Sequence, residues 1–356
     1  MMLDRILDEP LSNWLKRPEQ SDTKEHIVIS SRIRLARNFK DIVFTNRQDK
    51  EALAKVDTMM RGILGVLKKA DGHEYSNISL DKLSDAEREI LVEKHLISPA
   101  MAQKAPYRAL VVSDDASVAV MVNEEDHIRI QAMAPGLDLS SAYAHAVQVD
   151  DAIESKYDYA FNEHFGYLTA CPTNVGTGMR ASVMMHLPAL VMTGRINRVV
   201  RSILQLGYSV RGLYGEGSDA LGHIYQVSNQ LTMGISEEDT IAQLEKVING
   251  LVAEERKARQ ALHDGDWEAF EDRVWRAYGT LEYARRLSGE EALSLLSDVQ
   301  LGMDMEILPK KGDTFFNELI VITRPNFLAK YAGKDAMTAS ERDSYRAKVI
   351  RSYIEK

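Results

Sequence analysis

Five arginines recur beside short β-branched segments and glycine-rich turns in this chain. They are Arg32, Arg34, Arg129, Arg180 and Arg211. Guanidinium groups can bind phosphate oxygens in a bidentate manner and neutralise charge on a phosphoryl group during transfer. Because the chain as a whole carries a formal net charge of -9, this pattern favours a local triphosphate site over a generally basic surface.

The segment SSRIR places Arg32 and Arg34 two residues apart on a predicted strand. Side chains at this spacing leave the same face of a strand. Two guanidinium groups on one face repel each other unless an anion lies between them. The alternative is a solvated strand face with Ser31 and Ile33 turned inward, and the segment alone does not exclude it.

The stretch YLTACPTNVGTGMRASVMM, residues 167–185, contains the only cysteine, Cys171. We predict a strand over residues 166–170, a turn at Gly176 and Gly178, and a helix over residues 181–193. The N-terminus of a helix presents free backbone N–H groups to an anion, and Arg180 would add a positive charge there. A tight turn with a surface arginine is the alternative. Without an identifiable histidine and acid partner, Cys171 is interpreted as a polar contact and not as a covalent catalyst.

The segment NEEDH, residues 123–127, places three carboxylates and a histidine in a predicted hairpin turn. The cluster is too compact for all its side chains to converge on a metal ion, so we expect no metal held by the protein. A solvated turn is the simplest interpretation. A carboxylate beside an arginine-rich phosphate site could instead orient a cationic nucleophile and accept its proton. His95 could stack on a base, or it could lie on a helix surface or in the core.

Composition limits the class of protein. The 356 residues are 45% hydrophobic and 27% charged, which is typical of a soluble globular protein of about two domains. The acidic charge argues against direct nucleic-acid binding, and one cysteine excludes an intramolecular disulfide. Since there is neither an apolar stretch of membrane-spanning length nor a signal-peptide pattern, we expect a cytoplasmic protein with no membrane contact.

The pattern of elements predicts an α+β fold. Residues 109–113, 116–123 and 126–133 have the character of short strands separated by turns, which indicates an antiparallel meander. Further strands are predicted around residues 26–38 and as a pair at 209–215 and 223–230, and helices over 83–96, 139–157 and 196–207. We assign residues 1–24 to an N-terminal lead-in and 25–235 to a catalytic core. Ser236 begins an N-capped helical pattern, so residues 236–356 are predicted to form a helical domain.

With SSRIR, NEEDHIR, CPTN-x-GTG and RGLYGEG in this order, the sequence resembles the phosphagen (guanidino) kinase family over roughly residues 25–235. The resemblance implies an antiparallel sheet flanked by helices. It also implies transfer of the γ-phosphoryl group of ATP to a guanidino nitrogen, with Mg²⁺ carried by the ATP. A guanidinium group, whose pKa lies above about 12, is a poor nucleophile until carboxylates localise its charge and accept a proton.

The resemblance also assigns residues. Glu125 and Glu216 match the catalytic carboxylates, Cys171 matches the active-site thiol, and His95 would lie against adenine. The implied ATP-binding positions are Ser30, Ser31, Arg32, Ile33, Arg34, His95, Arg129, Arg180, Ala181, Ser182, Val183, Met184, Arg211, Gly212, Leu213, Tyr214, Gly215 and Glu216.

Two differences narrow the resemblance. Only 29 residues precede Ser30, whereas members that act on free guanidino metabolites carry a longer N-terminal helical domain, and the helical region after residue 235 has no counterpart in them. Both features resemble the bacterial protein-arginine kinases of the McsB type. Their RDxxRA motif matches Arg342, Asp343, Arg346 and Ala347. On a helix, Arg342 and Arg346 could share one phosphoryl group, which implies phosphoarginine binding; a solvated amphipathic helix is the alternative.

We therefore expect an ATP-dependent protein-arginine kinase of bacterial stress response and protein quality control. By resemblance, its partners are proteins with exposed arginines, a heat-shock repressor, a zinc-binding activator protein, a Clp-type protease and a second copy in a homodimer. One alternative is a kinase of free arginine or another guanidino metabolite, against which the short N-terminal segment argues. The other is an inert phosphoarginine-binding adaptor, against which the filled catalytic positions argue.

Overall fold

The computed structural model describes residues 2–10, 12–16, 25–47, 49–212 and 220–355. Its centre is an eight-stranded sheet with the order β2-β3-β4-β5-β1-β8-β10-β9. Every neighbouring pair in this sheet is antiparallel. The strands are β1 (Val28–Arg37), β2 (Tyr75–Ser79), β3 (Ala109–Ser113), β4 (Val118–Val122), β5 (Ile128–Pro135), β8 (Met179–His186), β9 (Tyr208–Gly212) and β10 (Ile224–Asn229).

The predicted meander is confirmed as β3, β4 and β5, and the predicted strand pair is confirmed as β9 and β10. Strand β1 lies between β5 and β8 near the middle of the sheet. The predicted strand over residues 166–170 is shorter than expected. Only β7 (Gly166–Tyr167) is extended there, and it pairs with β6 (Phe161–Asn162) in a separate hairpin.

The predicted helix over residues 181–193 is wrong in its first half. Residues 179–186 form β8, and only α7 (Pro188–Met192) is helical. Strand β8 hydrogen-bonds to β1 on one side and to β10 on the other. Alanine and methionine favour helices in isolation, but pairing on both edges and burial on both faces select the strand.

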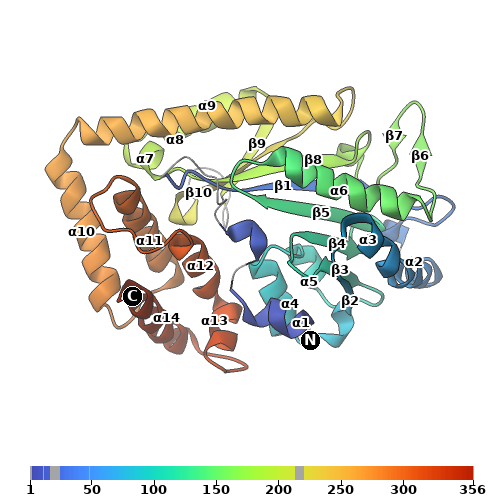
Figure 1. Ribbon diagram of the computed structural model, residues 1–356, viewed down its shortest axis with the longest axis horizontal. Helices are drawn as coiled ribbons and strands as arrows, with labels where there is room; N and C mark the ends of the chain where they lie inside the picture. Colours follow the sequence, from blue (N-terminus) through green and yellow to red (C-terminus); the bar gives the residue numbers. More distant parts are fainter. Residues whose placement is uncertain (1, 11, 17–24, 48, 213–219, 356) are drawn as a thin grey trace.

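One face of the sheet is covered by helices that share a core with it. Apolar side chains of the sheet, including Ile33, Ile130 and Val183, pack there against helix residues such as Leu67, Val149 and Leu244. The covering helices are α2 (Lys50–Gly62), α3 (Leu64–Asp71), α6 (Leu139–Glu154), α7, α8 (Ile196–Gln205) and α9 (Glu237–His263). Helix α9 lies along this side of the molecule (Figure 1). Thus the first helix after residue 235 packs with the sheet.

The opposite face holds a second core, to which the sheet contributes Ile29, Met121, Met133, Met184 and Ile224. Its helices are α1 (Met2–Asp8), α4 (Asp85–Glu93), α5 (Pro99–Ala102), α10 (Trp267–Tyr283), α11 (Gly289–Asp304), α12 (Phe315–Ile322), α13 (Pro325–Tyr331) and α14 (Ala339–Ile354). Helices α10–α14 gather into one group (Figure 1). The predicted α+β fold with a helical C-terminal region is confirmed.

Local sequence explains where several helices begin. Ser84 accepts a hydrogen bond from the backbone N–H of Glu87, and Glu87 bonds back to Ser84, which forms a capping box at the start of α4. The same arrangement of Thr338 and Glu341 begins α14. Such caps satisfy donors that the first turn leaves free. Within the described residues, no helix is both long enough and apolar enough to span a membrane.

Candidate active site

Strand register places the five predicted arginines on one face of the sheet. Arg34 on β1 lies opposite Arg180 on β8, and Arg32 lies opposite Ser182. Residues directly opposite each other in an antiparallel pair share a face, as do residues two apart on one strand. By the same register Arg129 on β5 and Arg211 on β9 share this face, because they pair with Ala36 and Gln226. We call the five residues the arginine face.

The ATP-binding positions predicted from the motifs separate into two groups. Ser30, Ser182 and Met184 lie on the side of the arginine face. In contrast, Ile33, Ala181, and Val183 are fully buried in the core on the opposite side, so the structure separates their side chains from the arginines.

Ser31 also lies on that opposite side. Its hydroxyl donates to the Gly136 carbonyl at 2.8 Å and accepts the Asp138 N–H at 2.9 Å. These two bonds tie β1 to the start of α6, and they occupy the hydroxyl that the motif offered to a nucleotide.

The charges on the arginine face are poorly compensated. Burial, followed by repulsion from Arg180 and Arg129, lowers the pKa of Arg32 to about 10. Burial and the neighbouring arginines also lower the pKa of Arg34 and of Arg180. The Nε of Arg34 is buried and has no hydrogen-bond partner within the described part of the chain. Cations held partly out of water without carboxylate partners are costly, so the face is arranged to receive an anion.

Arg129 differs because it is paired with two carboxylates of the NEEDH turn. Its Nη1 lies 2.6 Å from Glu124 Oε2, and its Nη2 lies 3.1 Å from Glu125 Oε2. Glu124 also accepts a hydrogen bond from Ser98. The Glu124 side chain is 6% exposed, whereas the Glu125 side chain is 46% exposed. Glu125, the predicted catalytic carboxylate, therefore stands at the open edge of the arginine face.

The rest of the NEEDH segment connects the turn to the loop that carries Cys171. One oxygen of Asp126, Oδ1, accepts the Asn38 side-chain amide at 2.7 Å and the Ala170 backbone N–H at 2.6 Å. His127 Nδ1 accepts the Phe39 backbone N–H at 3.0 Å. These buried contacts fix the two loops relative to each other. The sulfur of Cys171 lies 3.0 Å from the Thr173 hydroxyl.

The two glycines of the GTG turn are explained by close approaches of neighbouring atoms. At Gly176 (φ 112°) a Cβ atom would overlap the carbonyl of Thr232, and at Gly178 (φ 64°) it would lie 2.6 Å from the Arg37 guanidinium. Arg37 itself pairs with Asp150 at 2.7 Å and donates to the Thr177 carbonyl at 2.9 Å. The turn therefore holds the start of β8 by packing, and the predicted anion cradle at a helix N-terminus is wrong because no helix follows it.

His95 lies near the arginine face. Burial, with a smaller contribution from Arg32, lowers its pKa to about 3, so the ring is neutral at physiological pH. The ring is edge-on to Trp14, with centroids 5.7 Å apart. Gln131, which pairs with Arg34 across β5 and β1, donates to the His95 carbonyl at 2.7 Å. The predicted stacking on adenine stays a prediction.

Four predicted positions, Leu213, Tyr214, Gly215 and Glu216, lie outside the described residues. Gly212 ends β9, and Arg211 beside it is exposed. The structure therefore describes this part of the candidate site only through Arg211 and Glu125.

The RDxxRA motif lies on α14, but its two arginines have different surroundings. The side chain of Arg346 is 3% exposed and pairs with Asp343 at 2.7 Å. It also donates to the carbonyls of Thr323 at 3.1 Å and Leu287 at 2.7 Å. Arg342 is half-buried and donates to the Met337 carbonyl at 2.7 Å. Ala347 is fully buried in the core. Thus Arg346 is engaged by the protein itself, and the predicted sharing of one phosphoryl group by both arginines stays a prediction.

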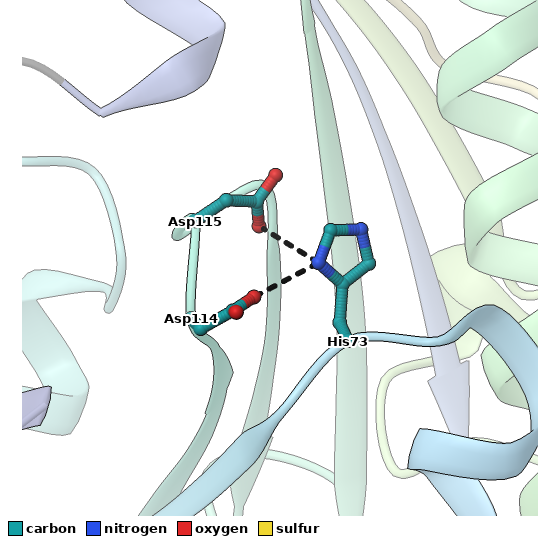
Figure 2. A group of neighbouring side chains, drawn as sticks. All are labelled: His73, Asp114 and Asp115. Atoms are coloured by element: carbon teal, nitrogen blue, oxygen red, sulfur yellow. Dashed lines mark hydrogen bonds and ion pairs between the residues drawn. The ribbon is translucent and has the colours of Figure 1, made fainter.

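A separate polar cluster consists of His73, Asp114 and Asp115 (Figure 2). His73 Nδ1 lies 2.9 Å from Asp114 Oδ1 and 3.9 Å from Asp115 Oδ1. Asp115 Oδ1 already accepts the Ser117 backbone N–H at 3.0 Å. Burial alone would lower the pKa of His73, but the hydrogen bond to Asp114 and the nearby carboxylates raise it. A histidine that pairs with carboxylates accounts for this cluster, so we assign no metal to it.

Two family models together match most of the chain. The model described as ATP:guanido phosphotransferase, C-terminal catalytic domain, matches residues 55–258, and the Protein-arginine kinase McsB C-terminal domain matches residues 268–356. The chain belongs to the ATP:guanido phosphotransferase family, among its protein-arginine kinases. The resemblance predicted from SSRIR, NEEDHIR, CPTN-x-GTG and RGLYGEG is thereby confirmed, as is its place among kinases that use ATP.

Relatives and solved structures agree with this assignment. The chain is 46% identical over 354 residues to the Protein-arginine kinase of Bacillus subtilis (strain 168). The matched region covers 99% of this chain and 96% of the relative. The chain is 45% identical over 359 residues to the Protein-arginine kinase of Syntrophomonas wolfei, with 100% and 98% covered. Among solved structures it is similar to a lombricine kinase, with a TM-score of 0.57 and 25% identity, over 67% of this chain and 68% of the other.

Proposed function

We propose that this chain transfers the γ-phosphoryl group of ATP to a guanidino nitrogen of arginine side chains in proteins. The observation that carries the proposal is the arginine face with the exposed carboxylate of Glu125 at its edge. Similarity along nearly the whole chain to proteins named Protein-arginine kinase supports a protein substrate.

In this proposal the arginine face binds the phosphates of ATP. Burial and mutual repulsion disfavour the charges of Arg32, Arg34 and Arg180. Phosphate oxygens that contact these guanidinium groups stabilise their charges. Mg²⁺ enters with the nucleotide and neutralises charge on its phosphates. The donor set fits this role, because the carboxylates of Glu124 and Glu125 pair with Arg129 and do not form a metal cage.

Glu125 is the group that activates the substrate arginine. A carboxylate at hydrogen-bond distance localises the guanidinium charge and accepts a proton from the attacking nitrogen. As the P–N bond forms, the bond from the γ-phosphorus to the β,γ-bridging oxygen breaks and ADP leaves. Glu216 is proposed as the second carboxylate and Cys171 as a polar contact of the substrate guanidinium.

A comparison of substrates tests the proposal. ADP release should be fast with an unstructured protein rich in exposed arginines and slow with free arginine at the same concentration of guanidino groups. The matched control is the same protein with its arginines replaced by lysines, which should give only the background rate of ATP hydrolysis. Efficient turnover of free arginine would contradict a protein substrate, whereas no turnover of either would contradict kinase activity.

We propose that residues 236–356 bind protein substrates and phosphoarginine, with Arg342 as the accessible arginine of RDxxRA. In the cell, the cytoplasm is the proposed compartment and stress-linked quality control the proposed role. The proposed partners are a heat-shock repressor, a zinc-binding activator protein, a Clp-type protease and a second copy of the chain. Co-purification of each purified partner with the chain would test these pairs one at a time.

A further inference from the structure

Buried arginines in this protein are usually paired with carboxylates. Arg37 lies 2.7 Å from Asp150, and Arg259 lies 3.2 Å from Glu255 and 2.9 Å from Asp304. Such pairing compensates the cost of burying a charge. It also leaves the guanidinium with little remaining affinity for an added anion.

Arg32 and Arg180 of the arginine face, which are both partly buried, differ from these pairs. Arg32 Nε lies 3.2 Å from the Ser182 hydroxyl, and its Nη2 lies 2.8 Å from Gln226 Oε1. Within the described part of the chain, Arg32 has no carboxylate partner. A neutral amide oxygen and a hydroxyl thus direct the guanidinium without cancelling its charge.

Arg180 is held in the same way by two serines. Its Nε lies 3.2 Å from Ser228 Oγ, and its Nη2 lies 2.9 Å from Ser209 Oγ and 3.1 Å from Ser228 Oγ. The two hydroxyls lie 2.7 Å apart and bond to each other. Among the described residues no carboxylate pairs with Arg180 either.

The neutral partners form an ordered row across the sheet. Ser182 on β8 pairs with Ser228 on β10, which pairs with Ser209 on β9. Gln226 stands two residues before Ser228 on the same face of β10 and opposite Arg211. Strands β8, β9 and β10 therefore present neutral side chains whose oxygens bond to Arg32 or Arg180.

We propose that Ser182, Ser209, Gln226 and Ser228 are positioning residues that fix Arg32 and Arg180 for the phosphates of ATP while leaving both charges uncancelled. We call these four residues the neutral frame. The inference deepens the proposed function and rests on it. Its physical basis is competition, because a carboxylate in the frame would form an ion pair in the unliganded protein and oppose the binding of phosphate oxygens.

The substitution Gln226→Glu tests this role, because it changes charge with little change in shape. If Gln226 only stabilised the fold, its substitution would lower the melting temperature of the unliganded protein. Here the new carboxylate pairs with Arg32 and relieves repulsion, so the melting temperature of the unliganded variant should equal or exceed that of the unchanged protein. Its affinity for Mg-ATP, measured by calorimetry with a non-hydrolysable analogue, should fall by about tenfold or more, equivalent to at least one strong charge-assisted contact.

Gln230→Glu is the matched control. Gln230 is exposed just beyond the end of β10, and its side chain donates to the Tyr208 carbonyl at 3.3 Å. The substitution Gln230→Glu makes the same chemical change as Gln226→Glu, but the affinity of the variant for the analogue should remain that of the unchanged protein.

The outcomes separate the inference from the proposed function. Wild-type affinity in Gln226→Glu would overturn the neutral frame, as would a loss of affinity accompanied by a lower melting temperature. An equal loss in Gln230→Glu would also overturn it, because charge alone would then explain the effect. If the unchanged protein does not bind the analogue, the proposed function fails together with the inference that rests on it.

Discussion

At the scale of single residues, Glu124 and Glu125 show how neighbouring carboxylates take different roles. Both contact Arg129, but Glu124 is buried and also bonds to Ser98, whereas nearly half of the Glu125 side chain is exposed. A buried carboxylate with two partners orients Arg129. The exposed one can accept a proton from an incoming guanidinium group.

Replacing Glu125 by alanine should therefore abolish arginine phosphorylation, with a loss of at least about a hundredfold from removal of the base. Arg129 keeps its pairing with Glu124, so the dissociation constant for Mg-ATP should change by less than about threefold. Steady-state rates and calorimetry measure the two effects separately. Glu163→Ala, which removes an exposed carboxylate between β6 and β7, should leave both values unchanged. Full activity of the Glu125 variant would remove its assigned role.

Residue type and local spacing indicate a phosphate site at the arginines, and the family resemblance assigns Glu125, because these features lie in short motifs. The neutral frame was not predictable from single segments. Gln226 and Arg32 are separated by 194 positions, and glutamine and serine carry no specific signal of a phosphate site. Their proposed role follows from the pairing of β1 with β8, of β8 with β10 and of β10 with β9.

At the scale of elements, Gly176 in the turn before β8 must be glycine for two reasons, whereas only one of them applies to Gly194, which lies between α7 and α8. Gly176 and Gly194 both have positive φ, at 112° and 68°. A Cβ atom at Gly176 would overlap the Thr232 carbonyl, whereas nothing lies within 4 Å of one at Gly194. Alanine substitutions at Gly194 and Gly176 therefore separate the free-energy cost of the backbone conformation from the cost of a steric overlap.

Gly194→Ala should lower the free energy of unfolding by about 1 kcal/mol, the typical cost of a left-handed residue with a Cβ atom. Gly176→Ala should cost about 3 kcal/mol or more, because backbone must also move. Urea denaturation of both variants measures these values. Equal losses would show that the overlap at Gly176 is relieved without strain.

Strand β8 shows why the elements were only partly predictable. The short β-branched strands β3 to β5 and the capped helix α4 carry strong local patterns, and their prediction is confirmed. Segment 179–186 has apolar residues on both faces, among them Met179 and Val183 on one side and Met184 on the other. Since both faces are buried, no clean alternation marks the strand, and pairing with β1 and β10 decides its conformation.

The structure of α14 changes how the RDxxRA motif should be tested. Arg346→Ala should lower the free energy of unfolding by about 2 kcal/mol or more, because it leaves Asp343 and the carbonyls of Leu287 and Thr323 without their donor. Arg342→Ala should leave stability nearly unchanged and weaken binding of a phosphoarginine peptide. Thermal melting and calorimetry distinguish the two. A peptide affinity unchanged in Arg342→Ala would count against phosphoarginine binding at this helix.

At the scale of the whole molecule, the sheet lies between two cores, and the C-terminal helices share one of them with the face that bears the arginines. His186 links these parts. It stands at the end of β8, and its Nε2 lies 2.7 Å from Ser297 Oγ on α11. The centroids of its ring and of the Phe316 ring on α12 are 4.7 Å apart. Packing at this junction joins the helical region to the sheet that carries the arginine face.

This junction predicts a loss of stability in acid. Burial, then the charges of Arg259, His223 and His26, lower the pKa of His186 well below its ordinary value. Because the unfolded chain binds a proton there near pH 6.5 and the folded chain does not, the free energy of unfolding should fall as pH drops below about 6.5. Urea denaturation between pH 7.5 and 5 measures the slope.

His186→Gln should make that slope shallower, since glutamine can still bond to Ser297 but does not titrate. His145→Gln, at an exposed position of α6, is the control and should leave the slope unchanged. A slope that is equally steep in all three proteins would assign the acid sensitivity to other groups.

The central claim is that the arginine face and Glu125 phosphorylate arginine side chains of proteins. Mass spectrometry of an arginine-rich protein after incubation with the chain and Mg-ATP tests it most directly, at neutral pH because the P–N bond is labile to acid. We expect phosphate on arginine with the unchanged chain and none with Glu125→Ala. Phosphate confined to serine, threonine or tyrosine, or no phosphorylation by a chain that binds ATP, would contradict it.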